Sequence, residues 1–375
     1  MIRVLLVGGG SGGHIYPLLA VAEEFSRMQG ISVKLSYIGP KNALNQEFVD
    51  RDIPVYTIAS SKIRRYFSLY NFIDVPKFFW SIFQALYHLY RLMPDVVFSK
   101  GGPGSLAVVL AARFYFIPVL VHESDAVPGL TNKISGRLAQ RVAVSFPEAE
   151  KYFSKKKVAF TGNPLRAELM EGMLDREKAR RKLGFQTDMP LLLVLGGSRG
   201  AEQLNNFVLD NLPALVAFVQ VIHQSGTEAF SSVATAAHAT LRGIGPTVAE
   251  RYRVIDHMNT GTLRDALCAA DIVLSRSGST IAEIAAFGKP SILVPLESSA
   301  NDHQRANAYS YAASGAAEVF DGKNFTYHVV ELKMKEILEH PEMYEKMSTA
   351  AKRFSRLDAT QNIANEIIRL TALGK

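Results

Sequence analysis

Short aliphatic runs alternate with amphipathic stretches along almost the whole chain of 375 residues. The runs have the uniformly apolar composition of buried parallel strands, and the stretches between them have helical spacing. This alternation favours parallel sheets covered by helices on both faces. The predicted strands are Ile2–Val7, Val33–Ile38, Val55–Ile58, Asp95–Ser99, Pro118–His122, Arg141–Ser145 and Val158–Thr161, then Leu191–Leu195, Val219–His223, Tyr252–Ile255, Asp271–Ser275, Ser291–Val294 and Ala317–Val319.

The second half of the chain begins as the first half does. An aliphatic strand, a glycine-serine loop and a helix start at Leu191, as they do at Ile2. The pattern predicts an α/β protein with two tandem Rossmann-like domains, joined near residues 162–164, whose carboxyl strand ends face one cleft. The predicted domains are 1–163, with a C-terminal helix of about 355–375 packing back on it, and 164–354.

Glycines interrupted only by Ser11 fill positions 8–13, between a predicted strand and a predicted helix. Backbone N–H groups of such a loop can approach a ligand closely, and the positive end of the helix points at the same place. The loop suits a phosphate, although a tight turn without a ligand is the alternative. Gly8, Gly10 and Gly13 fit the dinucleotide fingerprint, but the second strand ends in Ile38-Gly39 without an acidic residue, which disfavours an NAD-dependent dehydrogenase.

His14 follows this loop at the start of the helix. A positive helix end favours the neutral, proton-accepting imidazole, which suits a general base. A structural histidine is the alternative.

A second cluster follows Arg276, where a Ser/Gly/Thr turn leads into a helix predicted to begin near Thr280. Free amides and hydroxyls there would receive a pyrophosphate. Glu283, one turn further, could accept two ribose hydroxyls or merely complement the helix dipole. Gln304 and Asn307 are three positions apart and could contact a sugar or form a solvated helix face.

The chain carries a formal net charge of +7 and a pI near 9.3, which favours an acidic partner without choosing between nucleotide, nucleic acid and anionic lipid. The single cysteine, Cys268, excludes an internal disulfide and is expected to be a buried structural thiol. No signal peptide is predicted, because the apolar stretch after Arg3 is short and runs directly into glycines. No transmembrane helix is predicted either, because Arg113 and Pro118 break the longest apolar region, 106–121.

The segment from Asn71 to Asp95 predicts an unusual helix. A narrow polar stripe runs through a surface otherwise dense in Phe, Trp, Tyr and Leu. A helix buried on two sides is one interpretation, but nearby stretches that place cations beside aromatics favour peripheral contact with an anionic membrane surface. Lys155 to Lys157 indicate a solvated turn rather than a nucleic-acid site. The stripe is Asp74, Lys77, Ser81, Gln84, His88 and Arg91, and the predicted membrane residues are Phe72, Phe79, Trp80, Phe83, Phe114 and Phe116.

The joint set of motifs resembles the MurG family of membrane-associated UDP-N-acetylglucosamine transferases over nearly the whole chain. The matching segments, in order, are GGGSGGHIYPLLAVA, HESDAVPGLTNK, GNPLR, GGSRGAEQLN, HQSG, SGSTIAEIAAFGKPSILVPL and DHQRANA. The resemblance implies the GT-B fold, with UDP-N-acetylglucosamine bound mainly by the C-terminal domain and a lipid acceptor by the N-terminal one.

The resemblance also implies the reaction and its setting. The C4 hydroxyl of the N-acetylmuramoyl sugar of lipid I (undecaprenyl-pyrophosphoryl-MurNAc-peptide) displaces UDP from C1 with inversion and forms lipid II at the cytoplasmic face of the cell membrane. No tightly bound cofactor, metal site or nucleic-acid partner is expected, and Asp50-Arg51-Asp52 reads as a surface helix end rather than a metal ligand.

Site roles carry over from the family at matching positions. Ser11, in place of the usual threonine, borders the diphosphate and the acceptor with its neighbours, and His14 and Glu123 are acceptor-side groups. Asp125 stands where the family has Asn, and it rivals His14 as the base, as Glu123 does. Pro103 replaces the usual aromatic. The expected donor contacts are Ser11, Gly12, Gly13, Asp125, Arg166, Ser198, the backbone of Ile255 at uracil, Ser279, Thr280, Glu283 at the ribose, Gln304 at the sugar hydroxyls, and Asn307.

Three rival functions are compatible with the same motifs. A related GT-B enzyme could use another lipid acceptor, a UDP-N-acetylglucosamine epimerase would release UDP with no acceptor present, and a nucleotide-sugar-binding subunit would turn nothing over.

Overall fold

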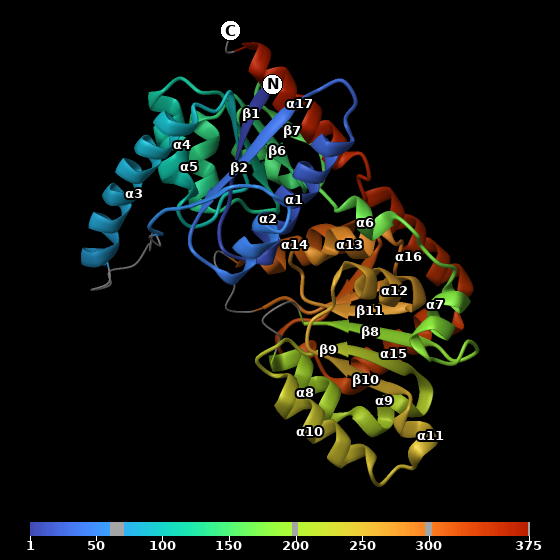
Figure 1. Ribbon diagram of the computed structural model, residues 1–375. Helices are drawn as coiled ribbons and strands as arrows, with labels where there is room; N and C mark the ends of the chain where they lie inside the picture. The colour runs from blue at the N-terminus through green and yellow to red at the C-terminus, as the bar shows by residue number, and fades with distance from the viewer. Residues whose placement is uncertain (61–70, 197–201, 297–301, 374–375) are drawn as a thin grey trace. The chain divides into compact units, whose positions relative to one another are not determined.

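The computed structural model describes residues 1–60, 71–196, 202–296 and 302–373. The chain forms two compact units (Figure 1), Met1–Ala167 with Arg356–Lys375, and Glu168–Ser355. Residues 164–167, which the sequence assigned to the second domain, cluster with the first unit. Arg166 therefore belongs to the same unit as His14.

The described part of the first unit contains a parallel sheet of seven strands in the order β3-β2-β1-β4-β5-β6-β7. Every strand lies where the hydrophobic pattern predicted it, and no end differs by more than one residue. The strands are β1 Ile2–Val7, β2 Val33–Gly39, β3 Val55–Thr57, β4 Val96–Ser99, β5 Val119–Glu123, β6 Arg141–Val144 and β7 Val158–Phe160.

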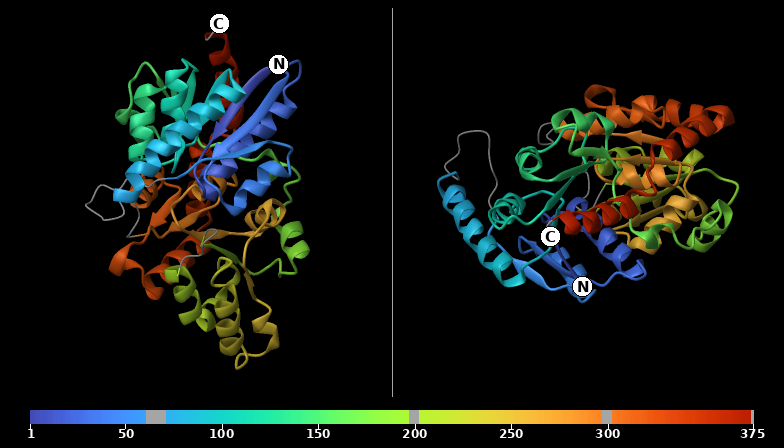
Figure 2. Two further views of the ribbon diagram at one scale, coloured as in Figure 1. Left: turned by 60° about the vertical axis from the view of Figure 1, so that its left-hand side comes forward. Right: turned by 90° about the horizontal axis from the view of Figure 1, so that it is seen from above.

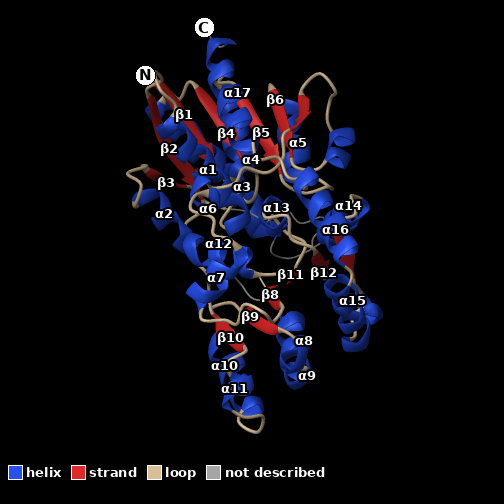
Figure 3. Ribbon diagram, turned by 90° about the vertical axis from the view of Figure 1, so that its right-hand side faces the viewer, coloured by secondary structure: helices blue, strands red, loops and turns tan. Residues whose placement is uncertain are grey.

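Both faces of this sheet are covered by helices. Along β1, Val4 and Leu6 face one core cluster while Leu5 and Val7 face another, and all four are fully buried. The first cluster includes apolar residues of α1 and of the C-terminal helix α17, which lies along the strands (Figure 3). The helices are α1 Gly12–Arg27, α2 Gln46–Val49, α3 Asn71–Leu92, α4 Ser105–Phe114, α5 Leu130–Leu138 and α17 Ala359–Leu373, with 3-10 turns η1 Ala43–Asn45 and η2 Pro147–Tyr152.

The second unit repeats this construction with a six-stranded parallel sheet in the described residues, ordered β10-β9-β8-β11-β12-β13. This is the strand order of a classical dinucleotide-binding fold. Here too the predicted strands are confirmed to within one residue at each end. They are β8 Leu191–Leu195, β9 Gln220–Gln224, β10 Tyr252–Ile255, β11 Ile272–Ser275, β12 Ser291–Leu293 and β13 Ala317–Val319.

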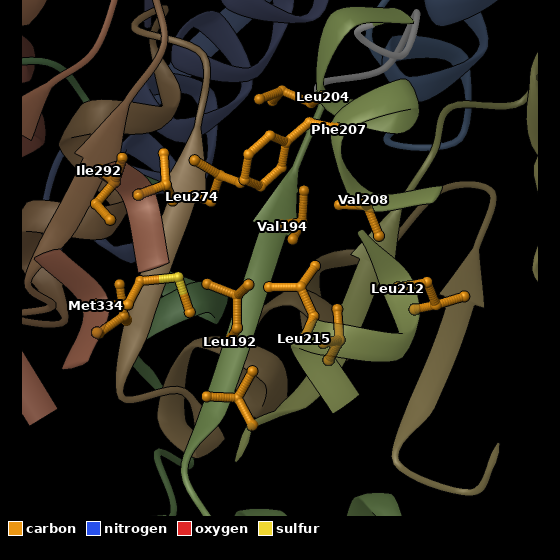
Figure 4. Packing of buried hydrophobic residues seen from close by; sticks show 14 of the residues in the cluster. Leu192, Val194, Leu204, Phe207, Val208, Leu212, Leu215, Leu274, Ile292 and Met334 are labelled. Atoms are coloured by element: carbon orange, nitrogen blue, oxygen red, sulfur yellow. The ribbon is translucent and has the colours of Figure 1, made fainter. Parts of the chain in front are cut away.

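The core of the second unit is built on the same alternation. Leu192 and Val194 of β8 point toward the face covered by α8, α9 and α15 (Figure 4). Leu193 points to the opposite face, among residues of α7, α12 and α13. The helices are α6 Ala167–Met170, α7 Arg176–Leu183, α8 Glu202–Asp210, α9 Leu212–Phe218, α10 Phe230–Leu241, α11 Pro246–Ala249, α12 Thr260–Ala269, α13 Thr280–Ala286, α14 His303–Ala313, α15 Tyr327–Glu339 and α16 Pro341–Phe354, with the 3-10 turn η4 Gly322–Asn324.

Among the helices of the described ranges, none has the length and apolarity needed to cross a membrane. The apolar region 106–121 divides into α4 and β5, as its central arginine and proline predicted.

The strand order reverses between β1 and β4 in the first unit and between β8 and β11 in the second. Ligands of open parallel sheets bind outside the carboxyl strand ends at such reversals. The glycine loop after β1 and the Ser/Gly/Thr turn after β11 both lie at these positions. The topology therefore makes both of them candidate ligand sites.

Candidate functional site

The glycine loop after β1 touches the glycine loop after β4 through its backbone. The N–H group of Gly9 donates to the carbonyl of Gly101 at 2.9 Å, and a Cβ atom added to Gly102 would lie 2.8 Å from Cα of Gly9. Gly102 also has a φ of +88°, a conformation that other residues rarely adopt. Side chains at these two positions would therefore push the loops apart. Helix α1 begins at Gly12, so Gly12 and Gly13 are part of its first turn rather than of the loop.

His14 lies in that first turn, and its imidazole ring lies between Ser11 and Gly102. Its Nδ1 atom is 2.6 Å from Oγ of Ser11, and a Cβ atom at Gly102 would lie 3.1 Å from Nε2. In the tautomer that carries hydrogen on Nδ1, the ring donates to Ser11 and leaves Nε2 as a proton acceptor. The geometry fits a general base held at a helix N-terminus.

Glu123, the last residue of β5, is 3% exposed and organises the loop that follows it. Oε1 accepts the N–H of Asp125 at 2.9 Å, and Oε2 accepts the N–H of Gly129 at 3.3 Å and Nδ2 of Asn132 at 3.0 Å. Burial, with a further contribution from the Asp125 charge, raises the pKa of this carboxyl to about 7. Both oxygens are engaged in shaping the loop, while Asp125 itself is half-buried.

Asn132 of α5 links this loop to the loop after β4, because a Cβ atom at Gly101 would collide with its side-chain amide. His14 contacts the β4 loop from the other side. The structure thus connects the candidate catalytic residues of the first unit through Gly101 and Gly102. The sequence analysis did not predict Asn132 as a site residue, although Asn132 lies in HESDAVPGLTNK, one of the segments that match the family.

A buried polar cluster lies behind these loops. Nζ of Lys100, which is 1% exposed, lies 2.8 Å from Nδ1 of His122 and 3.3 Å from Oδ1 of Asn163. Nε2 of His122 lies 2.9 Å from the carbonyl of Gly162. Burial lowers the pKa of Lys100 to about 8 and holds the pKa of His122 well below its usual value. A neutral His122 can accept from Lys100 and donate to Gly162, which joins the sheet to the segment before Arg166. The sequence did not single out Lys100.

Arg166 reaches back to the first turn of α1. Its guanidinium carbon lies 4.3 Å from the centroid of the Tyr16 ring. The residue before it is fixed by Thr360 of α17, whose Oγ1 bonds both the N–H and the carbonyl of Leu165 at 3.1 Å. Tyr16 was not predicted as a site residue, and no sequence pattern connects it to Arg166.

In the second unit, the turn after β11 is tied to α14. Oγ of Ser277 donates to the carbonyl of Gln304 at 2.7 Å, and Nδ2 of Asn307 donates to the carbonyl of Ser277 at 3.0 Å. Oε1 of Gln304 accepts the N–H of Leu296 at 3.0 Å. Asn307 is completely buried, so its side chain does not lie on a solvated face and holds the turn instead.

Helix α13 begins at Thr280, as predicted, with Ser279 at its N-cap. These two residues and Glu283 are half-buried at the same helix end. Ile255 ends β10, and its carbonyl accepts the N–H of Ser225 at 3.0 Å, which ties it to the HQSG loop. The expected phosphate contact Ser198 lies outside the described residues.

No group of three or more His, Cys, Asp or Glu side chains that could hold a metal ion occurs in the ranges that the structure describes. Asp50 is the C-cap residue of α2 and accepts a hydrogen bond from Gln46, as expected of a surface helix end. Cys268 is buried, also as expected.

Helix α3 lies along the outside of the first unit (Figure 2). Phe79, Trp80 and Phe83 are 57%, 61% and 64% exposed. Ser81, from the polar stripe, is instead fully buried, and Gln84 accepts the N–H of Ala59 at 2.8 Å. The interpretation of α3 as a helix buried on two sides is therefore wrong for its described side chains.

The same surface continues onto the end of α4. Phe114 and Phe116 are 67% and 80% exposed, and the guanidinium of Arg113 lies 5.6 Å from the Phe116 ring centroid. Tyr115 connects the two helices by donating to the carbonyl of Leu86 at 3.4 Å. We call the exposed residues Phe79, Trp80, Phe83, Phe114 and Phe116 the aromatic face. The side chain of Phe72 lies outside the described part of the structure.

Two family models match the chain. The glycosyltransferase family 28 N-terminal domain matches residues 4–144, and the glycosyltransferase family 28 C-terminal domain matches residues 191–363. Together they cover both predicted Rossmann-like halves.

Two relatives that match over their full length share one protein name. The chain is 36% identical over 370 residues, 98% of its length and 99% of the relative's, to UDP-N-acetylglucosamine--N-acetylmuramyl-(pentapeptide) pyrophosphoryl-undecaprenol N-acetylglucosamine transferase 2 of Bacillus anthracis. It is 35% identical over 373 residues, 99% of its length and 100% of the relative's, to the transferase of the same name, without the final number, of Thermoanaerobacter sp. (strain X514).

Solved structures share the fold. MurG of Acinetobacter baumannii matches with a TM-score of 0.74 and 27% identity, over 98% of this chain and 100% of that one. A UDP-GlcNAc 2-epimerase of Neisseria meningitidis bound to UDP-GlcNAc matches with a TM-score of 0.70 over 98% and 100% of the two chains. Its identity of 17% shows a common fold alone.

Proposed function

The chain belongs to glycosyltransferase family 28, and from that premise we propose that it transfers N-acetylglucosamine from UDP-N-acetylglucosamine to lipid I, which yields lipid II for peptidoglycan synthesis. The observation that carries the proposal is 36% identity, over 98% of the chain, to a transferase named for this reaction. The epimerase alternative rests on a common fold, and no residue contact within the described ranges favours it.

The reaction is a single displacement at C1 of the donor sugar. The C4 hydroxyl oxygen of the N-acetylmuramoyl sugar forms the new bond to C1, the bond from C1 to the β-phosphate oxygen breaks, and UDP leaves. His14 takes the hydroxyl proton on Nε2, since its other nitrogen is engaged with Ser11. Glu123 acts by holding the loop that carries Asp125, because both of its oxygens accept hydrogen bonds from that loop and from Asn132.

Charge develops on the leaving diphosphate as the bond to C1 breaks. We assign Arg166, Ser11 and the amides of Gly12 and Gly13 to that charge, because they gather at the N-terminus of α1. One well-placed donor of this kind is worth about 3–4 kcal/mol in the transition state. On the second unit we assign the backbone of Ile255 to uracil, Glu283 to the ribose hydroxyls, Gln304 to the sugar hydroxyls, and Ser198, Ser279 and Thr280 to the phosphates. Asn307 supports the turn that precedes Thr280.

The enzyme works at a membrane surface through the aromatic face. Exposed rings beside Arg113 and Lys77 suit the interface of an anionic bilayer, where apolar rings enter the headgroup region and cations stay with the phosphates. A lipid acceptor is confined to that surface, so peripheral attachment at the cytoplasmic face, where UDP-sugars occur, brings enzyme and substrate together.

The test is UDP release from UDP-N-acetylglucosamine, measured with and without a short-chain lipid I analogue. We expect release only with the analogue, together with a disaccharide product in which the new linkage is β-1,4. Release without the analogue would support an epimerase. Binding of UDP without release in either case would contradict the transferase and indicate a binding subunit or another acceptor.

A further inference from the structure

The guanidinium of Arg166 lies over the ring of Tyr16, although the two residues are far apart in the sequence. The guanidinium carbon is 4.3 Å from the ring centroid, and both side chains are half-buried. A cation over an aromatic face is attracted by the electrons of the ring, and more strongly where water is partly excluded. The ring therefore restrains the direction in which the arginine points.

Gly12 makes room for this ring. Tyr16 follows Gly12 by four positions on α1, so the two residues share one helix face. A Cβ atom at Gly12 would lie 3.0 Å from Cε2 and 3.3 Å from Cδ2 of Tyr16. A side chain at Gly12 would displace the ring, and the guanidinium with it. Close approach of a phosphate is thus not the sole reason for a glycine at this position.

The backbone beside Arg166 is already fixed. Thr360 bonds both polar groups of Leu165, and Lys100 bonds the side chain of Asn163. The contact with the Tyr16 ring restrains the long side chain of Arg166 before a ligand binds. A side chain that is held in its bound direction loses less entropy on binding.

We propose that Tyr16 is a positioning residue for the donor diphosphate, which holds the Arg166 guanidinium at the N-terminal turn of α1. The proposal rests on the proposed function, in which Arg166 contacts the phosphates of the donor. It adds a residue whose ring binds no part of the substrate and acts through the arginine.

The test compares UDP binding by calorimetry for the wild-type full chain and for Tyr16→Leu, Tyr16→Phe and Arg166→Met. We expect Tyr16→Leu to weaken UDP binding about tenfold, which corresponds to about 1.4 kcal/mol. Tyr16→Phe keeps the aromatic face and is expected to bind within about twofold of wild type. Uridine, which has no phosphate, is expected to bind all four proteins equally, which separates a lost phosphate contact from a damaged fold.

The double variant Tyr16→Leu/Arg166→Met identifies the route of the effect. If Tyr16 acts through Arg166, the double variant binds UDP no more weakly than Arg166→Met alone. Additive losses, or an unchanged affinity of Tyr16→Leu for UDP, would overturn the positioning role. A wild-type protein that does not bind UDP at all would instead overturn the proposed function, so the two failures are distinguishable.

Discussion

Oγ of Ser11, the N-cap residue of α1, lies 2.6 Å from Nδ1 of His14 in the first turn of the helix. In the proposed mechanism this bond sets the plane of the imidazole, and Nε2 accepts the proton of the acceptor hydroxyl. We expect Ser11→Ala to lower kcat about five- to tenfold, because one net hydrogen bond of about 1–1.5 kcal/mol no longer orients the ring. Ser11→Thr retains the hydroxyl and is expected to keep kcat within about threefold. Steady-state transfer to the short-chain lipid I analogue measures both.

His14→Ala is expected to give the largest loss of kcat, because it removes the imidazole that Ser11 orients. Loss of a general base is expected to lower kcat about 10²- to 10⁴-fold, while the affinity for UDP stays within about threefold of wild type. If Ser11→Ala transferred at the wild-type rate while His14→Ala did not transfer, the hydrogen bond would not be what orients the base.

Removal of the carboxylate charge is expected to destabilise the protein at Glu123 but to change its stability little at Asp125. In Glu123→Gln an NH₂ group replaces one buried oxygen and faces an N–H donor, so the free energy of unfolding should fall by about 1–3 kcal/mol. In Asp125→Asn the half-buried side chain changes little, and the backbone N–H of residue 125 still donates to Glu123. Urea unfolding and transfer rates of both variants measure the difference.

Asp125→Asn also decides between the candidate bases. We expect it to transfer within about threefold of wild type, because an amide can make the same sugar contact as the carboxylate. An amide cannot accept the proton, so the variant removes Asp125 as a candidate base. A loss of a hundredfold or more with normal stability would assign the base to Asp125 rather than to His14.

The stability of the second unit is expected to depend on pH through His223. This histidine lies between Tyr252 and Asn205, each 2.9 Å from one ring nitrogen, and burial lowers its pKa to about 4. In the unfolded chain the ordinary pKa is about 6.5, so the unfolded state binds the proton first as the pH falls. The contribution of the neutral ring is fully present above about pH 6.5 and is lost toward pH 4, to the extent of about 3 kcal/mol.

Urea unfolding at pH 7, 5.5 and 4.5 tests this dependence. His223→Gln is expected to be less stable at pH 7 and to lose about 2 kcal/mol less than wild type between pH 7 and pH 4.5. His238→Gln, at an exposed histidine of α10, is the matched control for loss of an imidazole. Parallel pH profiles of the wild type and His223→Gln would show that His223 does not titrate in this range.

The aromatic face is expected to determine membrane binding without affecting the rate of transfer to a water-soluble acceptor. The double variant Trp80→Ser/Phe83→Ser should bind vesicles with 30% anionic lipid about tenfold more weakly or worse, because two exposed rings can no longer enter the headgroup region. Transfer to the water-soluble analogue should stay unchanged. Leu332→Ser on α15, also at an exposed apolar residue, is the control and should bind vesicles normally. Equal vesicle binding by all three proteins would exclude this surface as the membrane contact.

The sequence predicted that Phe79, Trp80 and Phe83 of α3 contact a membrane, and these side chains are exposed. It did not predict which part of the polar stripe faces the core, and Ser81 from that stripe is fully buried. The usual rule for amphipathic helices fails here because Ala85 and Leu89, which follow Ser81 at helical spacing, provide the apolar contacts to the sheet. Small and aliphatic residues decide the packing, and the bulky rings remain outside.

The sequence by itself determined the thirteen strands of the described structure, the two Rossmann-like halves and the family. These depend on the period of apolar residues and on short motifs, which are local properties of the chain. Only the tertiary structure decided that Asn307 is buried and that the Arg166 guanidinium lies over the Tyr16 ring. Each of these depends on groups that come together only when the parallel strands bring their following loops to one edge of a sheet, and no local pattern encodes the partner.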